Sequence, residues 1–272
     1  MSDQDEDQVS GPAREPAPID RNMKPSRRPL KPVLMSQDSY DKRPTGPSVG
    51  LHPGTIEGLQ VNGESLWTDA TKGYLKGAFD AFDTAHKAVE AIYTARRDVP
   101  MNRFASEDEY WVHLADLADR MKDRATKALD YAAKNLNTAV AQTRTALETP
   151  IKSAATRPMS AEIRAHVAKL TVTQRNVLMR EASRDVLDAI LGAEPFLSGM
   201  SKVEHETYLK MYHERFSPEI AFRMKAMSHA LEMIETRGPL VFPEAEKALG
   251  QSWTFIEVVR KRDAKMKAAL AG

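Results

Sequence analysis

The sequence of 272 residues contains no cysteine, and this absence removes several classes of chemistry. Without thiols the chain cannot form disulfides, bind zinc or iron–sulfur clusters through thiolates, or use a cysteine nucleophile. A chain without disulfides is typical of a reducing compartment. We therefore expect a protein made in the cytoplasm.

Long apolar runs and an excess of positive charge are also missing. No uncharged apolar run approaches the roughly 20 residues that a membrane-spanning helix needs. The acidic start of the chain lacks the cationic and apolar segments of a secretory signal. The 39 basic residues are balanced by 38 acidic residues, for a net charge of +1. This balance excludes a generally cationic nucleic-acid coat, but it leaves room for a local basic patch.

Motifs of the common enzyme classes are missing as well. His205-Glu206 is followed by His213-Glu214, but a zinc-protease helix needs two histidines four residues apart. Eight residues place these imidazoles about 12 Å apart along a helix, too far for one ion. A phosphate loop fails because Glu64 stands where lysine is required. We expect no catalytic residue, no metal and no cofactor, and we interpret the His205–Glu214 face as an exposed charged helix face.

Residues 1–64 differ from the rest of the chain in composition. They hold nine of the 16 prolines and one of the 18 aromatic residues, and about 25% of them are hydrophobic. Ordering a backbone costs about 1–2 kcal/mol per residue, and so few apolar side chains cannot offset that cost. The composition predicts an extended arm that is disordered when the chain is alone.

A basic stretch at residues 21–31 overlaps the most apolar patch of this arm, Leu30–Met35. Prolines stiffen the segment toward polyproline II, a conformation that many proteins recognise. One interpretation is a docking peptide for a neighbouring subunit or partner, and the other is a simple tether with incidental charges. The docking residues would be Arg21, Lys24, Arg27, Arg28, Leu30, Lys31, Val33, Leu34 and Met35.

The remaining 208 residues are about 47% hydrophobic and follow helical spacing throughout. Prolines fall where helices would start or stop, and Ser106, Thr171 and Ser201 each open a capping box. The fold class is therefore all-α: a long helical hairpin at 65–149 and a smaller helical bundle at 158–272, preceded by the extended arm. The expected helices are 65–98, 106–148, 160–169, 172–192, 202–216, 218–237 and 243–270.

Apolar residues of the second helix recur with an 11-residue repeat, which is typical of a straight or slightly right-handed bundle. A helix near 42 residues long should project or pack along a partner, unless Asn135 and Asn137 interrupt it. Alanines within the stripe would allow close contact between helices. The predicted self-association residues are Tyr110, Leu114, Leu117, Met121, Ala125, Ala128, Ala132 and Leu136.

Three further features leave alternatives open. His86 on the apolar stripe of the first helix is either a histidine at the core edge or a pH-sensitive contact. Methionines in the C-terminal half either fill the core or form an adaptable interface. The last helix ends in cations that either complement the helix dipole or contact nucleic acid. These cations are Arg260, Lys261, Arg262, Lys265 and Lys267.

Together these patterns favour a non-enzymatic structural or assembly protein that self-associates through its long helices. Its arm would dock on neighbouring subunits or on other proteins of an assembly. By analogy of shape, a component of a large particle such as a virion fits, and this places the protein in the cytoplasm or in a viral particle. The alternative, which is less favoured, is a helical nucleic-acid-associated protein that uses residues 21–31 and 260–267.

Overall fold

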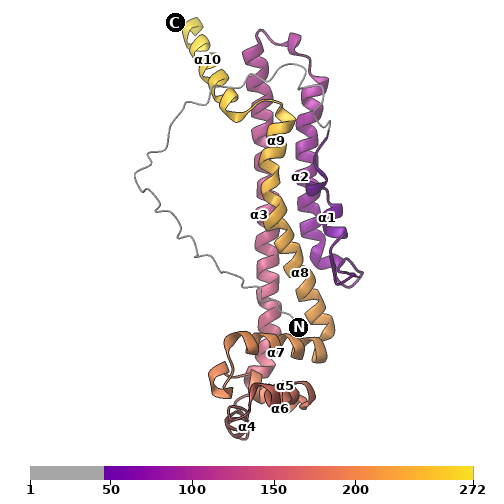
Figure 1. Ribbon diagram of the computed structural model, residues 1–272. Coiled ribbons are helices and arrows are strands. Elements are labelled where there is room, and N and C mark those ends of the chain that lie inside the picture. The colour runs from indigo at the N-terminus through magenta and orange to yellow at the C-terminus, as the bar shows by residue number, and fades with distance from the viewer. Residues whose placement is uncertain (1–45, 272) are drawn as a thin grey trace, which may run out of the picture. The chain divides into compact units, whose positions relative to one another are not determined.

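The computed structural model describes residues 46–271, and α-helices account for most of this part of the chain (Figure 1). The helices are α1 (Gly54–Glu57), α2 (Lys72–Asp98), α3 (Glu107–Ala154), α4 (Ser160–Val167), α5 (Val172–Glu181), α6 (Arg184–Leu191), α7 (Lys202–Phe216), α8 (Pro218–Arg237), α9 (Val241–Leu249) and α10 (Trp253–Ala271). Short 3-10 helices are η2 (Val49–Leu51), η3 (Met101–Arg103), η4 (Pro195–Ser198) and η5 (Gly238–Leu240). Strands β1 (Gln60–Val61) and β2 (Glu64–Ser65) form one antiparallel pair. The predicted all-α fold class is confirmed.

Helices α2 and α3 form the predicted hairpin, joined by the short η3. Small buried side chains on both helices let their backbones approach each other closely. On α2 the buried small residues are Ala78, Ala81, Ala85 and Ala88, and on α3 they include Ala115, Ala118 and Ala125. Phe82 of α2 supplies the largest fully buried side chain among residues 46–271.

Helix α3 has 48 residues, so it extends for about 72 Å at 1.5 Å per residue. Ser106 caps its first turn as predicted, accepting a hydrogen bond from the Glu109 amide. The predicted stop at Pro150 is wrong, because the helix continues to Ala154. Proline removes one helical hydrogen bond, but the buried side chains of Leu147 and Ile151 on either side hold the segment in place. The asparagines at 135 and 137 do not interrupt the helix either.

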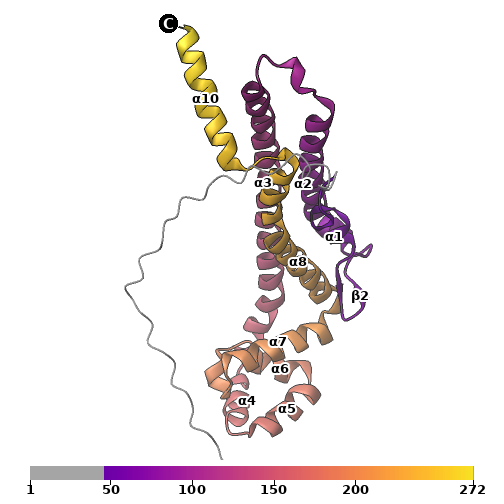
Figure 2. The same ribbon diagram turned by 45° about the horizontal axis from the view of Figure 1, so that its top comes forward.

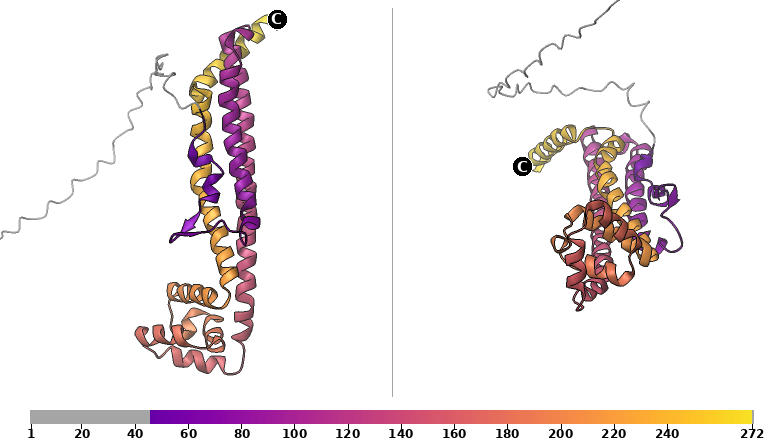
Figure 3. Two further views of the ribbon diagram at one scale, coloured as in Figure 1. Left: turned by 90° about the vertical axis from the view of Figure 1, so that its right-hand side faces the viewer. Right: turned by 60° about the horizontal axis from the view of Figure 1, so that its bottom comes forward.

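Helices α8, α9 and α10 return along α3 and share its main hydrophobic cluster (Figures 1 and 3). The predicted bundle at 158–272 is therefore corrected: only its first part forms a group of its own. The helix expected at 243–270 is also two helices, because Gly250 ends α9 in the left-handed conformation with a φ of 77°. Proline is found at the first turn of α8, as predicted from Ser217-Pro218.

A smaller hydrophobic cluster joins the end of α3 to α4–α7 (Figure 3). Complete capping boxes begin α5 at Thr171 and α7 at Ser201, as the sequence predicted. The helix expected at 172–192 is interrupted at residues 182–183, so it forms α5 and α6 instead. Arg175 ties the group together, since its buried guanidinium donates to the carbonyl oxygens of Ser198 and Gly199.

Residues 49–66 are folded, which moves the end of the predicted arm toward the N-terminus. Leu51, Ile56, Leu59 and Leu66 are all buried in the main cluster. Between the two strands, residues 62–63 turn with positive φ, a geometry that suits Asn-Gly and forms a tight hairpin (Figure 2). Four apolar side chains within 16 residues thus suffice to anchor a segment whose average composition suggested an extended arm. The remaining part of the arm, residues 1–45, lies outside the described residues.

Among residues 46–271, no helix combines the length and the apolar character that crossing a bilayer requires.

Candidate functional site

The stripe predicted for self-association lies inside the chain's own fold. Tyr110, Leu114, Ala125, Ala132 and Leu136 are buried, and Leu117, Met121 and Ala128 are partly buried. Met121 and Ala128 pack against the main cluster. The prediction that these residues form an intermolecular surface is corrected, because α2, α8 and α10 cover the stripe within one molecule. The 11-residue repeat identified the buried face, but it could not distinguish a partner chain from the same chain folding back.

The cations predicted for nucleic-acid contact mostly bind the chain's own carboxylates. Arg260 lies 2.7 Å from Asp116 and from Asp119 on α3. The other ion pairs of this helix join Arg262 to Asp108 and Lys267 to Asp263. Ion pairs within the chain thus involve three of the five predicted cations, and Lys261 and Lys265 are exposed members of the set without an ion pair in the described residues. The docking residues Arg21, Lys24, Arg27, Arg28, Leu30, Lys31, Val33, Leu34 and Met35 lie outside the described part.

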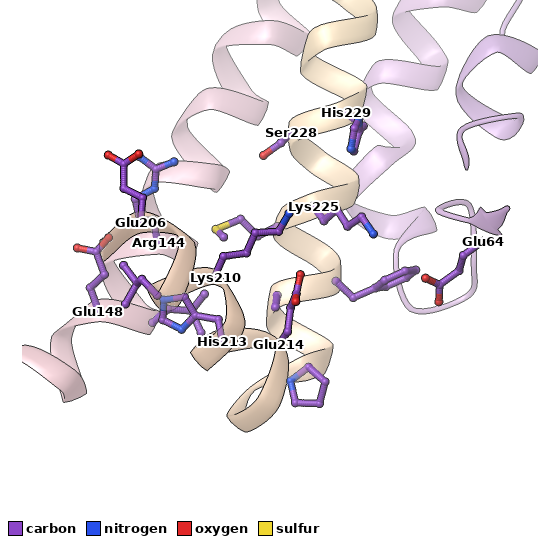
Figure 4. Close-up of a pocket in the computed structure, with 16 residues that line it drawn as sticks. Glu64, Arg144, Glu148, Glu206, Lys210, His213, Glu214, Lys225, Ser228 and His229 are labelled. Atoms are coloured by element: carbon purple, nitrogen blue, oxygen red, sulfur yellow. The ribbon is translucent and has the colours of Figure 1, made fainter. Parts of the chain in front are cut away.

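A groove runs along α7. It consists of two hollows of about 790 and 800 Å³. The hollows share Glu148 of α3 with Glu206 and Leu209 of α7, so they meet at this point. Walls of the first hollow come from α3, α7 and α8 (Figure 4), and the second continues past the end of α6 to η4. We call the two hollows together the α7 groove.

Apolar side chains form much of the lining of the α7 groove. In the first hollow they include Leu147 of α3, Leu209 of α7 and Phe222 of α8. In the second they include Ile151 of α3 and Phe196 of η4, whose side chain is 72% exposed. An exposed phenylalanine beside a depression is typical of a surface that another molecule covers. Binding sites commonly have hollows of roughly 300–1,000 Å³, so each of these hollows has the size of a recognition site.

Charges of both signs surround this apolar lining. Figure 4 shows Lys210 extending from α7 toward α8, with Glu214 and Lys225 close to the same hollow. Glu148 is paired with Lys152 at 2.8 Å. Three carboxylates and three cations of the groove take part in no ion pair within the described residues, so they are available to a ligand. They are Glu64, Glu194 and Glu214, with Arg144, Lys210 and Lys225.

His213 of α7 is the one buried polar side chain of the first hollow, with 5% exposure. Its Nδ1 atom has no hydrogen-bond partner in the described part of the chain. Burial lowers the pKa of His213 below the usual 6.5, and the negative charge of Glu148 offsets part of this effect. The lowered pKa makes His213 a neutral side chain near pH 7, when one ring nitrogen can accept a hydrogen bond from a ligand.

We expect acidification to destabilise the fold partly through His213. Because its pKa is lower in the folded state, the unfolded chain binds more protons just below pH 6.5, and stability falls as the pH drops through this range. H213F removes this proton uptake, so the melting temperature should depend less on pH between about 7.5 and 5. The matched control is H166Q, at an exposed histidine of α4. Equal slopes for wild type and H213F would contradict the expectation.

His86 is partly buried on α2, which places it at the edge of the core. Its ring contacts that of His52 at 5.0 Å between centroids. Burial and the neighbouring His52 lower the pKa of His86, while the carboxylates of Glu90 and Asp83 raise it. The contact therefore places a histidine with a lowered pKa where residues 46–66 meet α2.

The α7 groove was not identified as a site from the sequence, although some of the residues that line it were considered there. The face with His205, Glu206, His213 and Glu214 was interpreted as an exposed charged face, but it lines the groove and His213 is buried. The sequence offers a partial signal, because Leu209 lies beside the buried Tyr208 and Tyr212 on α7 and widens its apolar side. An apolar side that is wider than one contact needs can also form the edge of a second surface.

The methionines of the C-terminal half occupy different positions in the structure. Met227 fills the main cluster and Met200 the smaller one, while Met224 lines the α7 groove.

Residues 46–271 contain no group of three or more histidine, aspartate or glutamate side chains placed to hold a metal ion. Comparison of the chain with protein-family models, with curated proteins and with solved structures finds no match in any of the three.

Proposed function

We propose that this protein is a non-enzymatic structural protein that assembles with copies of itself and with other proteins of a large particle such as a virion. The α7 groove is the observation that carries the proposal. It combines an apolar lining, an exposed phenylalanine and unpaired charges of both signs over two adjoining hollows. Such a surface suits an extended protein segment, which presents apolar and charged side chains in turn.

The assembly mode differs from the one that the sequence suggested. The long-helix stripe is used within the chain, so association has to use another surface. The N-terminal segment supplies the complementary partner: it carries few residues able to form a core, yet it contains an apolar patch flanked by bases. A segment of this kind gains order by binding to a folded surface, and its exchange between copies links them into an assembly.

Light scattering coupled to size-exclusion chromatography tests the proposal. At tens of micromolar, the full chain should elute as a species larger than a monomer. A chain that lacks residues 1–45 should form oligomers with fewer subunits. It should still fold, because all residues of both described hydrophobic clusters lie after that segment. A monomer at this concentration, unchanged by the deletion, would contradict self-assembly.

A further inference from the structure

We infer that the α7 groove binds the segment Leu30–Met35 of a neighbouring copy of this chain. The inference rests on the proposed function and adds to it the two surfaces that meet. The length of the groove, the side chains that line it and its distance from Ser48 can each be compared with the segment.

The length of the groove suits a short extended peptide. Along α7, the lining residues run from Lys202 to Glu214, which corresponds to about 18 Å of helix at 1.5 Å per residue. An extended or polyproline II chain advances about 3.1–3.3 Å per residue, so that six residues cover this distance. Leu30–Met35 has six residues, and Pro29 and Pro32 favour the extended conformation before binding.

The chemical pattern of the segment matches the groove. Leu30, Val33 and Leu34 offer aliphatic side chains to a lining that contains Leu209 and Phe222. The flanks of the segment are charged: bases precede and accompany it at 27, 28 and 31, and acids follow it at 38 and 41. The three unpaired carboxylates and three unpaired cations of the groove would thus meet a segment whose flanks carry three bases and two acids, an arrangement with charge complementarity of both signs.

The position of the groove sets the distance that a link within one molecule would have to span. The backbone N–H of Ser48 donates to the carboxylate of Glu244, which fixes the start of the described chain on α9. From Glu244 back to the groove residue Met224 is about 30 Å along the helices at 1.5 Å per residue. The residues between Met35 and Ser48 can span at most about 45 Å. The link therefore has the reach to bring the segment to the near end of the groove of its own chain, and the crosslinking experiment distinguishes this from binding to a neighbouring copy.

Cysteine crosslinking between two differently tagged copies tests the inference, since the natural chain has no cysteine to interfere. One copy carries L34C in the segment, and the other carries A221C, at a small and partly buried residue of the groove wall. Under mild oxidation the mixture should yield a disulfide-linked dimer with one copy of each tag. The matched control replaces A221C by A264C, at an exposed alanine of α10, and its yield should be at least several-fold lower.

A substitution in the full chain provides the second measurement. L34D places a charge among the apolar groove residues, so the concentration needed for self-association should rise about tenfold or more. V9D, at an apolar residue outside the segment, should leave that concentration unchanged. Equal crosslinking at 221 and 264, or a crosslink within one doubly substituted chain and none between copies, would overturn the inference. If the chain still forms arm-dependent oligomers in that case, the proposed function stands and only the assigned groove is wrong.

Discussion

F82A is expected to lower the free energy of unfolding by about 3–5 kcal/mol, the usual cost of removing a buried phenylalanine. Phe82 is fully buried in α2, within the cluster shared by α2, α3, α8, α9 and α10. One turn before and one turn after Phe82 on α2 are Ala78 and Ala85, which are fully buried and too short to move into the space. Most of the lost contacts therefore remain lost, and the cavity adds to the transfer cost.

Thermal and urea unfolding measure this effect. For a chain of this size, each kcal/mol corresponds to roughly 2–4 °C in melting temperature, so the melting temperature of F82A should fall by roughly 6–20 °C. Y131A is the matched control, since Tyr131 is an aromatic residue of α3 with 69% exposure, and its change should stay within about 0.5 kcal/mol. A loss below 1 kcal/mol for F82A would mean that α2 does not pack in the main cluster as described.

Helix starts were predictable from the sequence because they depend on a few neighbouring residues. Thr171 and Ser201 define where α5 and α7 begin, through reciprocal hydrogen bonds that are entirely local. The ends and interruptions were less predictable. Gly250 ends a helix, whereas Gly73 and Gly77 lie within α2, and the sequence does not distinguish these situations. Pro150 stays helical because tertiary packing outweighs one missing hydrogen bond.

The α7 groove could not be predicted because its walls come from segments far apart in the chain. Residues near 148, near 209 and near 222 meet only because α8 turns back along α3 after α7. Local patterns predict which side of each helix is apolar, but they do not specify the helix that covers it. The stripe on α3 shows the same limit: its burial was anticipated, and its partner turned out to be the same chain.

G192A is expected to be destabilising by about 1–3 kcal/mol, and by more if the helices cannot separate. Gly192 has an ordinary φ of −80° at the end of α6. The cost is therefore steric: a Cβ atom there would lie 2.2 Å from the carbonyl oxygen of Ile151 and 2.7 Å from Cβ of Ala155. Both belong to the C-terminal end of α3 and its cap, so α6 would have to move away from α3 and open the smaller cluster.

G77A is the matched control, and its expected effect has the opposite sign. Gly77 is an exposed residue of α2 with nothing within 4 Å of the position that a Cβ would take, so alanine should stabilise the helix by about 0.5–1 kcal/mol. Hydrogen exchange distinguishes the two variants by region. G192A should increase exchange in α4–α7 and leave α2 protected, because Phe82 and its neighbours form a separate cluster. Equal loss of protection in both clusters would show instead that α3 couples them into one cooperative unit, and wild-type stability in G192A would contradict the close approach of α6 to α3.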